Sequence, residues 1–192
     1  MRFIILLIGM ILLTGCTQNT GFWGPVLEVS PPNSVMGRYD ITLSTGRKLI
    51  TSETNSEIQI DVIAMTNDQY CKQKWFEYDL SSYFDPSGNE LRDGAPVWRA
   101  TLTADENSET LSAENPIWSI WEATDATHLI IIANEVEGGG VDEESRRMVI
   151  PLDRSRWLEN GIDLKLMGSG LVLRTRRLPP WPGQPKSQFK HY

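Results

Sequence analysis

The sequence is poor in the residues on which most enzyme chemistry depends. Among 192 residues it has two cysteines, Cys16 and Cys71, and two histidines, His128 and His191. His128 falls inside an apolar, β-branched run, where a histidine is more often a core residue than a general base. The sequence contains no Gly-x-Ser-x-Gly motif, phosphate-binding loop or paired His–Glu metal spacing. We therefore predict that the protein is not an enzyme and has no catalytic residues, bound metal or cofactor.

Long hydrophobic runs are also absent. The longest apolar run, residues 3–13, is broken by Gly9 and is shorter than the ~20 residues that a membrane-spanning helix needs. Its length and the preceding Arg2 are typical of a signal peptide. The sequence Leu-Thr-Gly-Cys at 13–16 follows it. This junction resembles the lipobox of bacterial lipoproteins, in which the signal peptide is removed and the cysteine is acylated.

The lipobox resemblance implies cleavage between Gly15 and Cys16 and lipidation of Cys16. Thr17 comes next, where aspartate signals inner-membrane retention in well-studied bacterial lipoproteins. The resemblance therefore favours an outer-membrane anchor with the domain in the periplasm. Acylation of Cys16 leaves Cys71 as the one free thiol, so no intramolecular disulfide is expected. We expect residues 1–15 to be the signal peptide and residues 16–25 to be a polar tether.

Charge is unevenly distributed along the chain. The formal net charge is -7, and every Asp and Glu precedes residue 173. Five basic residues follow residue 173: Arg174, Arg176, Arg177, Lys186 and Lys190. An acidic body argues against a nucleic-acid partner, because phosphate binding requires a basic face. Residues 179–192 are also rich in proline, and we expect them to form a basic tail outside the folded domain.

Four segments have strong strand patterns. Residues 57–65 alternate polar and apolar with a period of two over most of their length, and residues 97–103 repeat the alternation. Residues 127–134 form a continuous β-branched run, which is typical of a central strand buried on both faces. Residues 147–152 then predict its partner strand.

Weaker signals complete the set of elements. Residues 162–166 and 171–176 flank a Gly-containing turn, which predicts a hairpin. Weaker strands are expected at 26–29 and 39–43. Residues 68–84 predict a short helical insert, in which Asp79 caps the second turn.

Alternating strands need a facing layer to cover their apolar side. Residues 26–178 therefore predict a mainly β fold, a single β-sandwich with one short helical insert. A small barrel is the competing architecture. Asp153 is expected to cap a helical turn over 154–160.

Seven tryptophans are many for a chain of this length. We interpret Trp98 and Trp157 as core residues, because indoles contribute large buried areas. Trp118 and Trp121 lie in a loop-rich region in which strand and helical turn cannot be distinguished. With Trp181 they are candidate interface residues, for a protein partner or for sugar stacking.

The order of elements resembles the small lipoprotein of the type VI secretion membrane complex. The parallels are residues 58–62 with the aromatic helical segment 70–84, and the later segments 127–133 and 146–152. The resemblance implies a transthyretin-like β-sandwich with a helical insertion, tethered to the outer membrane. The acidic loop 142–144, interpreted as a solvated turn, has no counterpart. The tryptophan-rich stretch near residue 118 and the tail also have no counterpart in that family. No partner-binding residue is therefore carried over from it.

The sequence thus predicts a lipid-anchored, non-enzymatic lipoprotein that docks a periplasmic protein partner. It would be a structural component of an envelope assembly of the type VI secretion kind. The alternative is a lipoprotein that binds peptidoglycan or another carbohydrate through its tryptophans and basic tail.

Overall fold

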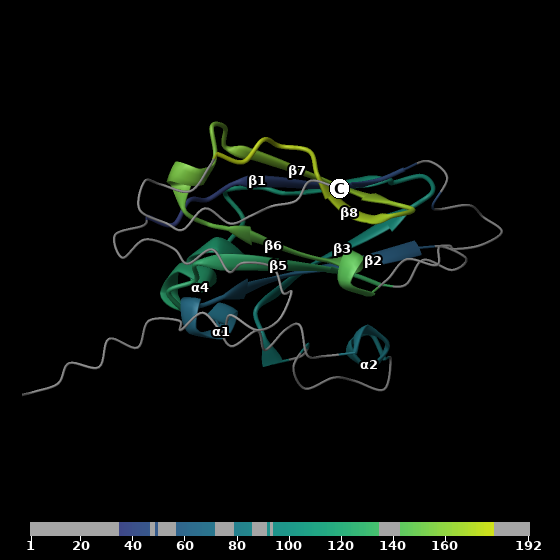
Figure 1. Ribbon diagram of the computed structural model, residues 1–192, viewed down its shortest axis with the longest axis horizontal. Coiled ribbons are helices and arrows are strands. Elements are labelled where there is room, and N and C mark those ends of the chain that lie inside the picture. Colours follow the sequence, from purple (N-terminus) through teal and green to yellow (C-terminus); the bar gives the residue numbers. More distant parts are fainter. Residues whose placement is uncertain are drawn as a thin grey trace, which may run out of the picture.

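The computed structural model describes residues 35–46, 49, 57–71, 79–85, 92, 94–134 and 143–178. In these residues eight strands form two four-stranded sheets that face each other as a β-sandwich (Figure 1). The first sheet has the order β4 (Ser108–Leu111), β1 (Asp40–Thr45), β7 (Gly161–Met167) and β8 (Gly170–Leu173). The second has the order β3 (Val97–Thr103), β2 (Glu57–Met65), β5 (His128–Ala133) and β6 (Arg147–Pro151). The predicted sandwich is confirmed.

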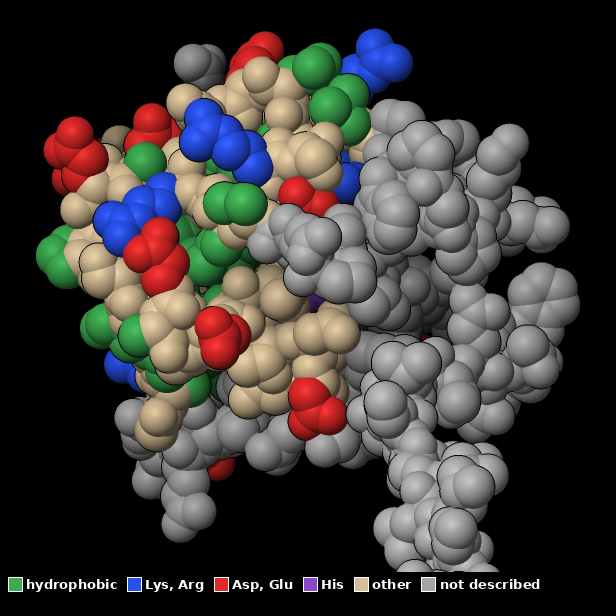
Figure 2. All heavy atoms as spheres, turned by 90° about the vertical axis from the view of Figure 1, so that its left-hand side faces the viewer, with side chains coloured by type: hydrophobic (Ala, Val, Ile, Leu, Met, Phe, Trp, Pro, Cys, Tyr) green, Lys and Arg blue, Asp and Glu red, His purple; other side chains and the backbone are tan. Residues whose placement is uncertain are grey.

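The helical segments are short and lie outside the sheets. They are α1 (Asn67–Cys71), α2 (Leu80–Tyr83), α4 (Ile117–Ala123) and the 3₁₀ turns η2 (Glu143–Arg146) and η3 (Arg154–Arg156). Among the described residues, no helix has the length and hydropathy of a bilayer span. Seen from the end of the sandwich at which α4 lies, charged side chains of both signs are interspersed with small apolar groups (Figure 2).

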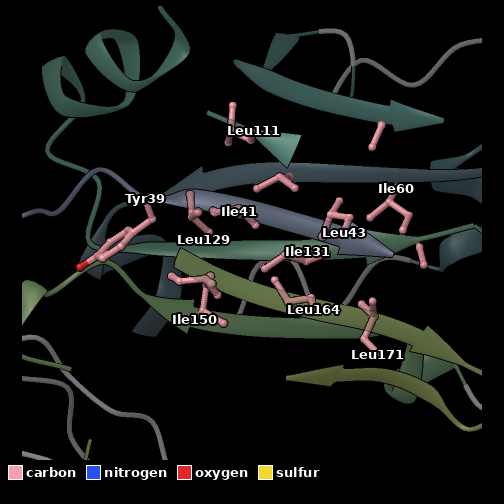
Figure 3. Packing of buried hydrophobic residues seen from close by; sticks show 14 of the residues in the cluster. Tyr39, Ile41, Leu43, Ile60, Leu111, Leu129, Ile131, Ile150, Leu164 and Leu171 are labelled. Carbon is pink, nitrogen blue, oxygen red and sulfur yellow. The ribbon is translucent and has the colours of Figure 1, made fainter. Parts of the chain in front are cut away.

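Apolar side chains from both sheets meet between them and form the main core. Ile41 and Leu43 of β1 and Leu164 of β7 lie opposite Leu129 and Ile131 of β5 (Figure 3). All five are at most 1% exposed. Burying a side chain of this size stabilises the fold by roughly 1.5–3 kcal/mol, so this layer is the main source of stability.

The second sheet is covered on its outer face as well. Ile63 of β2 and Ile130 of β5 point away from the main core and pack against Leu80, Tyr83 and Phe84 of the helical insert. All six residues of β5 are buried, which confirms the prediction of a central strand buried on both faces. The molecule therefore has three layers: first sheet, second sheet and insert.

The insert begins and ends close to the predicted positions. The carboxylate of Asp79 accepts the backbone N–H of Ser82 at 3.0 Å and caps α2, as predicted. Helix α1 is seen as far as Cys71, and residues 72–78 of the expected helix lie outside the described residues.

Two elements differ from the prediction. The polar stretch 105–115 contains strand β4, which pairs with β1. Ser108 and Thr110 face solvent, and Leu111 is the one buried residue of β4. The strand therefore lacks the alternation of polar and apolar residues by which a strand is predicted from sequence. The turn capped by Asp153 is shorter than expected and covers η3 alone. The expected strand at 26–29, the signal peptide, the tether and the tail lie outside the described residues.

The turn between β7 and β8 requires a glycine at one position. Gly170 has a φ of +112°, which side chains rarely tolerate, and its backbone touches η2. A Cβ at this position would lie 2.3 Å from the carbonyl oxygen of Ser145. Gly170 therefore allows β8 to approach η2 closely.

We expect Gly170→Ala to lower the free energy of unfolding by about 3 kcal/mol, because it adds backbone strain and a steric clash with backbone atoms. Gly161→Ala is the control, since a Cβ there meets no atom within 4 Å, and its effect should stay within about 1 kcal/mol. Urea denaturation measures both values. Equal effects of the two substitutions would contradict the close approach.

Candidate functional site

The two tryptophans predicted as interface residues on α4 are buried. Trp118 and Trp121 are both 0% exposed, and their ring centroids lie 5.0 Å apart in an edge-on contact. Trp118 also meets Tyr39 at 6.3 Å, and Tyr39 meets Trp157 at 6.2 Å. These four rings belong to the main core, and α4, which carries two of them, lies at one end of the sandwich (Figure 1).

The polar atoms of this tryptophan pair are also satisfied inside the domain. Trp118 Nε1 donates to the carbonyl of Ser112 and Trp121 Nε1 donates to that of Pro96, each at 2.9 Å. A spacing of three residues puts both rings on the inward face of the helix. The prediction that they form an exposed interface is therefore wrong. Trp181 lies outside the described residues and stays a prediction.

His128 is buried within the sandwich. It is 1% exposed, and its Nδ1 lies 2.9 Å from the hydroxyl of Thr127. In the part of the chain that the structure describes, no three His, Cys, Asp or Glu side chains converge to hold a metal. Gly15 and Cys16 lie outside this part of the chain, so the lipidation site stays a prediction.

A buried carboxylate attaches the insert to the second sheet. Asp61 of β2 is 0% exposed. It accepts the hydroxyl of Tyr83 at 2.9 Å and Nε of Arg92 at 2.8 Å, and Nε of Arg99 lies 3.7 Å away. The guanidinium of Arg92 also lies over the ring of Phe84, 4.9 Å from its centroid. The sequence does not reveal this cluster, because Asp61 resembles any other polar residue of an alternating strand.

The surroundings keep the hydroxyl of Tyr83 protonated. Burial, and then the negative charge of Asp61, raise the pKa of Tyr83 far above its ordinary value, so the phenol remains a donor. Arg92 makes a further bond from Nη2 to Oε1 of Gln59 at 2.9 Å. The cluster is a structural device that holds the insert in place.

In the described part of the chain, the outer face of the first sheet carries no covering layer. No described helix or strand lies over it, in contrast to the insert that covers the opposite side of the sandwich (Figure 1). A groove of about 390 Å³ runs on this face and is lined by Thr42, Ser44, Ser108, Asp163, Lys165, Met167 and Arg174. This face is the candidate docking surface.

Strand register sets the order of these side chains. Ile41 and Leu43 point into the core, so Thr42 and Ser44 point outward. The pairing of β1 with both neighbours places Thr110, Thr42 and Asp163 in one row. The same pairing places Ser108, Ser44 and Lys165 in the next row.

The docking surface carries hydrogen-bonding groups and charges of both signs. The hydroxyls of Thr42 and Thr110 lie 3.0 Å apart, and Asp163 and Arg174 are exposed. Met167 is 39% exposed and adds a flexible apolar contact. Such a surface suits hydrogen bonding and charge pairing with a polar partner.

Comparison with solved structures finds similar folds among type VI secretion proteins. Lip of Serratia marcescens, described as a membrane-bound component of that system, matches with a TM-score of 0.48 and 16% identity over 71% of this chain and 96% of that one. The lipoprotein TssJ1 of Pseudomonas aeruginosa matches with a TM-score of 0.46 and 12% identity over 76% and 100%. The C-terminal domain of TssM from EAEC matches with a TM-score of 0.48 and 13% identity over 70% and 98%.

These are similarities of fold. No protein-family model matches the sequence, and no curated protein matches it.

We expect Asp61→Asn to lower the free energy of unfolding by roughly 3–5 kcal/mol, because it leaves Arg92 and Arg99 without the charge that they surround. Tyr83→Phe removes one donor and should cost about 1 kcal/mol. Urea denaturation gives both values, and hydrogen exchange of the amides in α2 should increase more than that of β1. A change in which β1 and α2 lose protection equally would contradict a local role in holding the insert.

Proposed function

We propose that the protein is a lipid-anchored docking component of an envelope assembly, and that its open sheet face binds a periplasmic protein partner. The observation that carries the docking role is the asymmetry of the sandwich. In the described residues the insert covers the second sheet, whereas the groove of the first sheet presents Asp163, Lys165 and Arg174 to solvent. Opposite charges arranged in a fixed order give specificity for a complementary partner.

The sequence at 13–16 supports the anchor. A single acyl chain binds a membrane reversibly, whereas the several chains expected on a lipoprotein cysteine hold it firmly. Together with Thr17 this supports an outer-membrane location with the domain in the periplasm. The order of elements from 58 to 176 supports an assembly of the type VI secretion kind.

The carbohydrate-binding alternative loses its main support. It depended on exposed indole rings that stack on sugars, and both rings of α4 are buried. The basic tail with Trp181 remains in its favour. Docking of a protein is therefore the function that the geometry supports best.

We expect Cys16→Ser to abolish incorporation of labelled palmitate, because the acylated thiol is absent. Cys71→Ser is the matched control and should be labelled like the natural chain. Labelling of whole cells followed by purification of the protein measures both. Palmitate on the Cys16→Ser variant, or its loss from the Cys71→Ser variant, would show that the lipobox interpretation is wrong.

Ser108 is one of the residues that line the groove. We expect a photo-crosslinking amino acid at this position to give one adduct of defined mass with the partner in intact cells. The same probe at Ile120, which is 51% exposed on α4, should give none. Reversing two charges, with Lys165→Glu and Arg174→Glu together, should reduce the Ser108 adduct roughly ten-fold, because attraction becomes repulsion.

The control for this experiment reverses two charges elsewhere. Glu106→Lys with Glu114→Lys alters exposed residues that do not line the groove, and it should leave the adduct unchanged. Adducts that form equally from Ser108 and Ile120, or that survive reversal of the groove charges, would place the partner on another surface.

A further inference from the structure

Strand β4 is an edge strand of the first sheet and pairs with β1 on one side. The N–H of Thr45 donates to the carbonyl of Asn107 at 3.0 Å, and residues of an antiparallel strand bond alternately to one side and the other. The backbone of Glu109 therefore bonds to β1, whereas the N–H and C=O groups of Ser108 and Thr110 point away from it. Within the described residues nothing bonds to these outward backbone groups, and both residues are exposed.

The other strands at the edges of the sandwich are covered or blocked. On β3, the N–H of Thr101 donates to Oε2 of Glu109 at 3.1 Å. The N–H of Thr103 donates to the carbonyl of Glu106 at 2.9 Å. Strand β6 ends in Pro151, which has no N–H to offer, and β8 lies against η2. Blocking of this kind prevents pairing with other chains, so the edge of β4 is the one that the described structure leaves available for a further strand.

The edge of β4 adjoins the docking surface. Ser108 lines the groove, and the hydroxyls of Thr110 and Thr42 lie 3.0 Å apart. A strand added to β4 would continue the rows of outward side chains and widen the surface by one strand, about 4.8 Å. Its residue opposite Glu109 would have its Cβ about 5 Å from that of Glu109, so lysine or arginine is favoured there.

A second copy of this chain fits this edge poorly. Antiparallel pairing of two β4 strands through both outward residues places Ser108 of each copy opposite Thr110 of the other. The residue between them, Glu109, then lies directly opposite itself. Like charges in directly opposite positions are destabilising, so the edge favours a strand of different sequence.

We propose that the partner adds an extended segment to the edge of β4, as a fifth strand of the first sheet, with a basic residue opposite Glu109. This deepens the proposed docking function and rests on it. In strand addition the main-chain hydrogen bonds give affinity and the alternating side chains give specificity. Here the backbone groups of Ser108 and Thr110 supply the hydrogen bonds, and the charge of Glu109 selects the sequence.

The first test places a photo-crosslinking amino acid at Ser44, in the groove, and measures the adduct in intact cells. Thr110→Pro removes the outward N–H, and edge strands tolerate proline. We expect roughly ten-fold less adduct, because a carbonyl of the partner loses its donor. Leu173→Pro is the control, since Arg174 donates to β7 and the N–H of Leu173 therefore points outward at the other edge of the sheet. It should change the adduct by less than about two-fold.

The charge is tested separately. Glu109→Gln keeps an oxygen for the N–H of Thr101 and removes the charge, so the adduct from Ser44 should fall by up to about five-fold. An unchanged adduct would contradict the basic residue opposite Glu109. Urea denaturation of every variant restricts these comparisons to folded chains.

The second test needs no substitution in β4. Amide exchange is compared between the free chain and the complex isolated after crosslinking at Ser44. The amides of Ser108 and Thr110 should exchange at least about ten-fold more slowly in the complex, and that of Leu173 should not change. An adduct in which these two amides stay unprotected would overturn the strand addition and leave the docking function intact. An adduct of twice the chain's mass would identify a second copy and overturn the choice of partner. Absence of any adduct would overturn docking and strand addition together.

Discussion

The arrangement of layers depends on one buried charge. The carboxylate of Asp61 is inaccessible to water, and an unpaired charge in that position would be strongly destabilising. Its donors come from three places, because Arg99 lies on the neighbouring strand β3, Tyr83 lies on α2 of the insert, and Arg92 lies between α2 and β3. The insert therefore cannot move away without uncovering the charge. Apolar packing of Leu80 against the same face acts in the same direction, so the second sheet becomes the middle layer of the molecule.

This asymmetry determines which surfaces are available for a partner. The outer face of the second sheet is covered by the insert, and one end of the sandwich is filled by the rings of Tyr39, Trp118 and Trp121. The outer face of the first sheet has no such cover in the described residues, and its outward side chains are hydroxyls and charges. A face of this kind is stable in water and can still exchange its hydrogen bonds with those of a partner.

Sequence patterns identified the elements whose own residues determine them. The alternation at 57–65 and the β-branched run at 127–134 predicted β2 and β5, because burial on one or two faces imposes those patterns directly. The docking surface could not be predicted in this way. It depends on the parallel pairing of Thr42 with Asp163, two residues that are remote in sequence, and on β4, which lacks an apolar pattern. The prediction that Trp118 and Trp121 are exposed was wrong, because a spacing of three residues fits an inward and an outward face of a helix equally well.

Strand direction gives the groove a fixed orientation relative to the two ends of the described part of the chain. Strands β1 and β7 are parallel and both begin near η3, since Asp40 donates its N–H to the carbonyl of Asn160 at 2.9 Å. Val35 and Leu178 lie beside the same turn, because the carbonyl of Val35 accepts the N–H of Arg154 and Leu178 donates its N–H to the carbonyl of Arg156. Along the groove, the row that contains Thr42 lies nearer η3 and the row that contains Ser44 and Lys165 lies farther from it. In the proposed docking, the order of charges along β7, Asp163 and then Lys165, would set the direction in which the partner lies on the sheet.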